Sequence, residues 1–304
     1  MDSRVKIHYK ASHGTAGRLP ERRYPELYTE QSKALQNPVS TLNTLHVELV
    51  MNTINNFKAI ISSDWSECLS PNGPFDPLAF SFPSLKKDFE HVFRNYTGNV
   101  ITLQEAMHAI QDMIPARLTQ DQMDTYLDAS FSTYVGVPEF IQWCLDHDIL
   151  FMINTTSSQA YFQRAINKGL IPAVPIIAAH PVTSFPSPGD GDRYSLQVLE
   201  IDDKPKNTGH VMKQWGISPR QLIVIGDSGG DGPHFVWAHQ QNAHLIASMA
   251  KTSLLNYCKS RNVTIERFFG VVYKPDQPRE LDLELKYNFM DLVPMVLEIL
   301  NLDR

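Results

Sequence analysis

The chain has 304 residues, of which 42% are hydrophobic and 20% charged, a composition typical of a soluble globular protein with one large domain or two medium ones. Its formal net charge of −6 gives no electrostatic reason to expect nucleic acid or an anionic membrane as a partner. Three widely spaced cysteines (Cys68, Cys144 and Cys258) without a CxxC pair argue against a disulfide framework and a zinc site. With no apolar signal segment after Met1 and no run long enough to span a membrane, the expected location is cytoplasmic.

Residues 1–55 are expected to form an N-terminal extension that is partly irregular, because most of this segment is polar and has no sustained period. Leucines at helical spacing predict a helix over 41–55. The run FKAIISS at 57–63 then predicts a short buried parallel strand, and it ends directly before Asp64.

Residues 71–134 have a helical pattern with no evident strand. Two capping boxes, Thr102–Glu105 and Thr119–Gln122, each precede a helically spaced apolar run. The aromatic residues Phe75, Phe80 and Phe82 could face a ligand, although aromatic side chains in such a run more often belong to a core. The segment therefore predicts a small helical module inserted after the first strand.

From about residue 135 strands alternate with helices, which predicts a doubly wound parallel sheet. Helices are expected at 137–145, 159–168, 207–215 and 290–300, strands at 149–153 and 221–225, and short apolar runs lie at 174–178 and 196–201. Residues 241–304 are expected to complete the sheet and to carry no chemistry. In such sheets the reactive groups collect at the carboxyl ends of the strands.

Polar groups follow three of the predicted strands. They are Asp64, the pair Thr155 and Thr156, and the glycine-rich turn GDSGGDG with Asp227 and Asp231. Each alone is more often a cap or a turn. Together the carboxylates could hold Mg²⁺, which prefers oxygen ligands, and one carboxylate could attack phosphorus.

A hydroxyl and a lysine would then hold the remaining phosphoryl oxygens. The segment DKPK, with Lys204 and Lys206, offers the lysine just before the predicted helix at 207–215.

The order and separation of DWSECL, INTTSS, DKPK and GDSGGDG resemble the four motifs of the haloacid dehalogenase (HAD) superfamily over about residues 57–240. The resemblance implies a Rossmann-like core at 56–70 and 135–304, with a mobile helical cap at 71–134. It implies that Asp64 is the nucleophile, that Thr155 (alternatively Thr156) and Lys204 (alternatively Lys206) bind the phosphoryl group, and that Mg²⁺ is held by Asp64, the Ser66 carbonyl, Asp227 and, through water, Asp231.

Position 66 departs from the pattern, since phosphatases of this superfamily usually have a second aspartate two residues after the nucleophile. Ser66 retains the backbone carbonyl but has no carboxyl to protonate a leaving alcohol, and such general acid–base help is typically worth about 10²–10⁴-fold. One explanation is a substrate with a good leaving group. Another is that Glu67 or a cap residue supplies the acid.

A third explanation is cleavage of C–P or C–halogen bonds, because DWSEC is similar to the DWAGT of phosphonoacetaldehyde hydrolases. Those enzymes need a cap lysine for a Schiff base, and only Lys86 and Lys87 are candidates here. The chain could also be a catalytically weak protein that binds a phosphorylated ligand. The favoured expectation is a Mg²⁺-dependent phosphatase that acts on a small phosphorylated metabolite through an aspartyl-phosphate.

Overall fold

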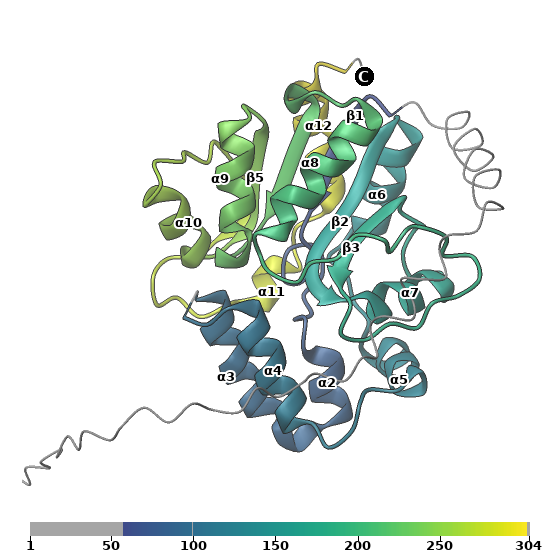
Figure 1. Cartoon of the computed structure of the whole chain (residues 1–304). Helices are drawn as coiled ribbons and strands as arrows, with labels where there is room; N and C mark the ends of the chain where they lie inside the picture. Colours follow the sequence, from purple (N-terminus) through teal and green to yellow (C-terminus); the bar gives the residue numbers. More distant parts are fainter. Residues whose placement is uncertain (1–56, 99, 303–304) are drawn as a thin grey trace, which may run out of the picture. The chain divides into compact units, whose positions relative to one another are not determined.

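The computed structural model describes residues 57–98 and 100–302. Within them, six parallel strands form one sheet in the order β3-β2-β1-β4-β5-β6 (Figure 1), which confirms the predicted doubly wound sheet. The strands are β1 (Ala59–Ser63), β2 (Ile149–Ser158), β3 (Ile176–His180), β4 (Leu222–Gly226), β5 (His244–Ala250) and β6 (Arg267–Val272). The predicted N-terminal extension, with its helix at 41–55, lies outside the described residues.

The sheet lies between two layers of helices. Side chains alternate along each strand, so that Ile61 and Phe151 pack into one apolar cluster and Ile60 and Leu150 into the other. Burial on both faces explains why these strands read as continuous apolar runs. The first cluster includes side chains of α6 (Val137–Asp146), α7 (Gln159–Asn167) and α12 (Val293–Leu300), and the second those of α8 (Asp203–Trp215), α9 (Gly232–Gln240) and α10 (Thr252–Lys259).

Four helices separate β1 from α6 along the chain, and Figure 1 shows them beyond the carboxyl ends of the strands. They are α2 (Asp76–Ser81), α3 (Lys86–Thr97), α4 (Leu103–Met113) and α5 (Gln120–Ser130). Thr102 and Thr119 begin α4 and α5 with complete capping boxes. A cap with boundaries at 71 and 134 stays a prediction. The remaining short elements are η1 (Pro83–Leu85), η2 (Pro219–Gln221), η3 (Gly229–Asp231), α11 (Leu281–Glu284) and η4 (Phe289–Leu292).

Two predicted boundaries differ from the structure near the strand ends. β2 continues through Ser158, past the predicted end at 153, and its pairing with β3 shifts register between Asn154 and Ser158. Helix α8 begins at Asp203, four residues before its predicted start. Proline is tolerated in the first turn of a helix, so Pro205 does not delay the start of α8. Asp203 also accepts hydrogen bonds from the backbone N–H groups of Leu199 and Glu200.

The apolar run at 196–201 forms no strand. Within it Val198 donates one backbone hydrogen bond to Ala179, and Gln197 makes an isolated bridge to the same residue. All three cysteines are buried and free. Among the described helices, none combines the length and apolar character that crossing a membrane requires.

Buried histidines should make the stability of the fold fall in mild acid. His180 ends β3, its Nδ1 accepts a hydrogen bond from the Val182 N–H, and burial lowers its pKa to about 4. The unfolded chain takes up a proton at His180 near pH 6.5, whereas the folded chain takes it up only near pH 4, so this histidine removes stability as the pH falls below 6.5.

Between pH 7 and pH 5 the unfolding free energy should fall in both proteins. We expect the fall to be about 2 kcal/mol smaller in His180→Gln than in wild type. Urea unfolding at both pH values measures the difference. The exposed His108→Gln variant is the control for the substitution itself. Equal pH dependence in wild type and His180→Gln would contradict the expectation.

Candidate active site

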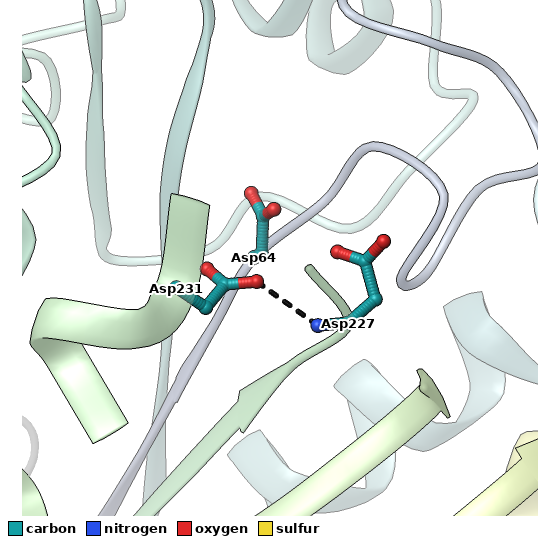
Figure 2. Close-up of side chains that lie close together, drawn as sticks. All are labelled: Asp64, Asp227 and Asp231. Atoms are coloured by element: carbon teal, nitrogen blue, oxygen red, sulfur yellow. Dashed lines mark hydrogen bonds between the residues drawn. The ribbon is translucent and has the colours of Figure 1, made fainter. Parts of the chain in front are cut away.

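Three aspartates meet where the order of the strands reverses. Asp64 follows β1 and Asp227 follows β4, which are adjacent strands, and the Asp64 N–H donates to the Ile225 carbonyl at 3.0 Å. Such a switch point is where parallel sheets open a crevice beyond the strand ends. Asp231 ends η3, and carboxylate oxygens of the three aspartates lie within 4.8 Å of one another (Figure 2).

The glycine-rich turn holds Asp231 in place. The Asp231 Oδ2 atom accepts hydrogen bonds from the N–H groups of Asp227 (2.9 Å, dashed in Figure 2) and Ser228 (3.3 Å). A side chain on Gly226 would come within 2.7 Å of the same oxygen, so glycine is required at that position. Burial alone would raise the pKa of Asp231, but Lys204 and the two N–H donors outweigh it and lower this pKa.

Lys204 reaches this cluster from the first turn of α8. Its Nζ lies 2.6 Å from Asp231 Oδ1 and 3.2 Å from Asp64 Oδ1, and the side chain is 1% exposed. Lys206 instead points to solvent with a 71% exposed side chain and pairs with Asp203 at 2.9 Å. The backbone carbonyl of Lys204 accepts a hydrogen bond from Asn154 Nδ2 at 2.8 Å, which fixes the start of α8 against β2. The structure therefore brings Lys204, rather than Lys206, to Asp64.

The two candidate threonines lie within β2 and face different partners. The Thr155 side chain makes a polar contact with the Asp64 carboxylate, and this contact lowers the Asp64 pKa. The Thr156 side chain makes its polar contact with Tyr96, which α3 contributes. Thr155 is thus the hydroxyl beside Asp64. Tyr96 is a neighbour that nothing in the sequence pattern singled out.

Ser66, two residues after Asp64, is nearly buried, and its Oγ lies 2.7 Å from Ser157 Oγ. Glu67, the next residue, forms ion pairs with Lys251 and with Arg279 Nη1, the latter at 2.7 Å. Burial would raise the pKa of Glu67, but Lys251 and Arg279 outweigh it and lower this pKa. Glu67 is therefore held as a carboxylate and is not free to give a proton to a leaving group at Asp64.

Lys251 extends the site toward the C-terminal part of the chain, where no chemistry was expected. It follows β5, and its Nζ lies 2.6 Å from Asp227 Oδ2 while also pairing with Glu67. Lysine directly after a buried strand is the sequence signal that could have found it. Its long-range pairing with Glu67 had no local signature.

Two carboxylate oxygens in the cluster have no hydrogen-bond donor among the described residues. They are Asp64 Oδ1 and Asp227 Oδ1, both buried, and Asp64 Oδ1 makes an ion pair with Lys204 at 3.2 Å without hydrogen-bond geometry. Burial raises the pKa of both aspartates, although Lys204 opposes the shift at Asp64 and Lys251 at Asp227. A buried oxygen without a donor is costly, and a hard divalent cation would satisfy both atoms. The residues present therefore fit a metal ion.

No protein-family model and no curated protein sequence matches the chain. Solved structures do resemble it. A phospho-aspartyl intermediate analogue of phosphoserine phosphatase has a TM-score of 0.57 at 14% identity, covering 79% of this chain and 99% of that one. A substrate-bound phosphoserine phosphatase has a TM-score of 0.56 at 12% identity, covering 78% and 98%.

A HAD family hydrolase from Salmonella enterica subsp. enterica serovar Typhi has a TM-score of 0.56 at 11% identity, covering 86% of this chain and 81% of that one. At these identities the likeness shows the fold. The chain therefore has the Rossmann-like α/β fold found in these HAD-type hydrolases.

Proposed function

We propose that this chain is a Mg²⁺-dependent hydrolase, and specifically a phosphatase that acts on a small phosphorylated molecule through an aspartyl-phosphate on Asp64. The observation that carries the proposal is the buried convergence of Asp64, Asp227 and Asp231 with Lys204, at a switch point of the sheet. Phosphatases of the same fold, one of them an analogue of a phospho-aspartyl intermediate, support it.

Each residue has a role that its contacts support. Asp64 attacks the phosphorus, while Lys204 and the Thr155 hydroxyl beside it hold the non-reacting phosphoryl oxygens as charge develops. Asp64, Asp227, the Ser66 carbonyl and, through water, Asp231 would hold Mg²⁺. The bound ion would supply positive charge that keeps Asp64 ionised and neutralises the phosphoryl group.

A pocket of about 270 Å³ lies next to Glu67, and its lining does not include Asp64, Asp227 or Lys204. It lies between the helices after β1 and the Glu67 loop, and the residues that line it include Glu67, Phe75, Lys86, Phe89, Phe93 and Arg279. Lys86 and Lys87 are both exposed, and no contact places either beside Asp64. Three free buried cysteines are in keeping with a reducing compartment such as the cytoplasm.

A phosphoester and acyl-phosphate panel with Mg²⁺ or with EDTA tests the proposal. We expect metal-dependent turnover by wild type and a loss of at least about 10³-fold in Asp64→Asn, because the nucleophile is removed. Mass spectrometry of the quenched enzyme should find a phosphoryl group on Asp64. Asp190→Asn is the matched control, since Asp190 and Asp64 are each 7% exposed and Asp190 lies outside the cluster.

Asp64→Asn with wild-type turnover would exclude the nucleophile. Phosphate binding without turnover of any panel member would instead favour a ligand-binding protein, and trapping of phosphonoacetaldehyde on Lys86 by borohydride would favour C–P cleavage.

A further inference from the structure

Tyr96 is buried at the candidate active site although it comes from α3, one of the helices inserted after β1. It is 4% exposed. A methyl group on Gly230, between Asp227 and Asp231, would lie 3.2 Å from the Tyr96 hydroxyl oxygen, and the Tyr96 side chain makes a polar contact with Thr156. Charges on Lys204, Asp64 and Asp231 all act on its pKa. The Tyr96 hydroxyl therefore lies beside the turn that carries Asp227 and Asp231.

An alcohol leaves phosphorus as a poor alkoxide unless its oxygen receives a proton. The other groups near Asp64 are badly placed to give one. The Ser66 hydroxyl is hydrogen-bonded to the Ser157 hydroxyl, and Glu67 is a carboxylate in two ion pairs. Lys204 is held between Asp64 and Asp231, at 3.2 Å and 2.6 Å. The Tyr96 phenol carries a proton and makes no ion pair within residues 57–98 and 100–302.

We propose that Tyr96 is the general acid and base of the hydrolysis, an inference that rests on the proposed phosphatase function. In the first step the Asp64 oxygen–phosphorus bond forms, the bond from phosphorus to the leaving oxygen breaks, and the Tyr96 proton passes to that oxygen to give an alcohol and a phenolate. In the second step the phenolate takes a proton from water, the water oxygen–phosphorus bond forms, and the Asp64 oxygen–phosphorus bond breaks. Phosphate leaves, and Asp64 and Tyr96 are restored.

The surroundings of Tyr96 suit both steps. Burial raises the pKa of Tyr96, although Lys204 opposes the shift. The phenol is therefore protonated at rest. The phenolate formed in the first step is a strong base held near the positive charge of Lys204. A simple alkoxide is more basic still, so proton transfer to it is favourable.

The effect of Tyr96→Phe should depend on the leaving group of the ester, which separates the role of Tyr96 as acid from its role as base. For a simple alkyl phosphate we expect kcat/KM to fall by about 10²–10⁴-fold. For p-nitrophenyl phosphate, whose leaving group needs no proton, kcat/KM should remain within a few-fold of wild type. Its kcat should nevertheless fall, with a burst of about one p-nitrophenolate per active site, because water attack on the aspartyl-phosphate has lost its base.

Tyr126→Phe is the matched control, because Tyr126 is a buried tyrosine of α5 whose hydroxyl has no hydrogen-bond partner among the described residues. Equal losses of kcat/KM on both esters, or no loss on either, would overturn the role of Tyr96 and leave the phosphatase proposal standing. A wild type that cleaves neither ester would overturn both.

If Tyr96→Phe melts far below wild type, 3-fluorotyrosine at position 96 keeps the side-chain shape with a more acidic phenol. An alkyl-ester rate that does not change with this substitution would count against the proposal.

Discussion

Lys204→Met is expected to lower kcat/KM by about 10²–10³-fold, the usual cost of removing one preorganised charged donor at a reacting centre. The physical reason is the position of its ammonium group, 3.2 Å from Asp64 and 2.6 Å from Asp231. Lys206→Met is the matched control from the same helical turn, since Lys206 is exposed and pairs with Asp203 rather than with Asp64 or Asp231. It should retain wild-type activity.

The same substitution should destabilise the metal-free protein. Methionine at position 204 leaves Asp64 and Asp231 buried without their cation, and breaking a buried ion pair in this way typically costs about 3–5 kcal/mol. Urea unfolding in EDTA measures the loss for Lys204→Met against Lys206→Met. If Lys206→Met loses activity and Lys204→Met does not, the assignment of the lysine is wrong.

The sheet and the meeting of the strand ends could be predicted from the sequence, because parallel strands place their carboxyl ends at one edge. The positions of Asp64 and Asp227 after apolar runs predicted that they lie at this edge, although each alone is more often a cap or a turn. The choice between Lys204 and Lys206 needed the structure. Residues two apart on a helix face different directions, and the direction depended on α8 beginning at Asp203 rather than at 207.

Tyr96 and Lys251 show why other parts of the site could not be predicted. Tyr96 lies on α3 beside apolar residues such as Phe89 and Val92 that share its buried face, so its spacing indicates only a core position. Lys251 meets Glu67 across 184 positions of sequence. Such a pairing leaves no periodic or local signal and arises only when β5 and the loop after β1 are brought together by the fold.

Arg279→Met is expected to cost about 3–5 kcal/mol of unfolding free energy, because Arg279 joins the buried carboxylate of Glu284 to the partly buried carboxylate of Glu67. Its Nη1 lies 2.7 Å from Glu67 Oε1 and its Nη2 lies 2.7 Å from Glu284 Oε2, while Tyr134 accepts a further hydrogen bond at 2.9 Å. Glu284 is completely buried. Without Arg279 it retains only the hydroxyls of Tyr134 and Tyr273 as partners.

Urea unfolding of Arg279→Met against Lys58→Met measures this effect. Lys58 also forms an ion pair, with Asp148 at 2.7 Å, but its side chain is 61% exposed, so its loss should cost less than about 1 kcal/mol. Arg279→Met/Glu284→Leu should recover part of the stability, since it removes the stranded carboxylate. Ion pairs link Asp227 to Lys251, Lys251 to Glu67, and Glu67 to Arg279. Equal costs for Arg279→Met and Lys58→Met would mean that these ion pairs do not hold the loop after β1 in place.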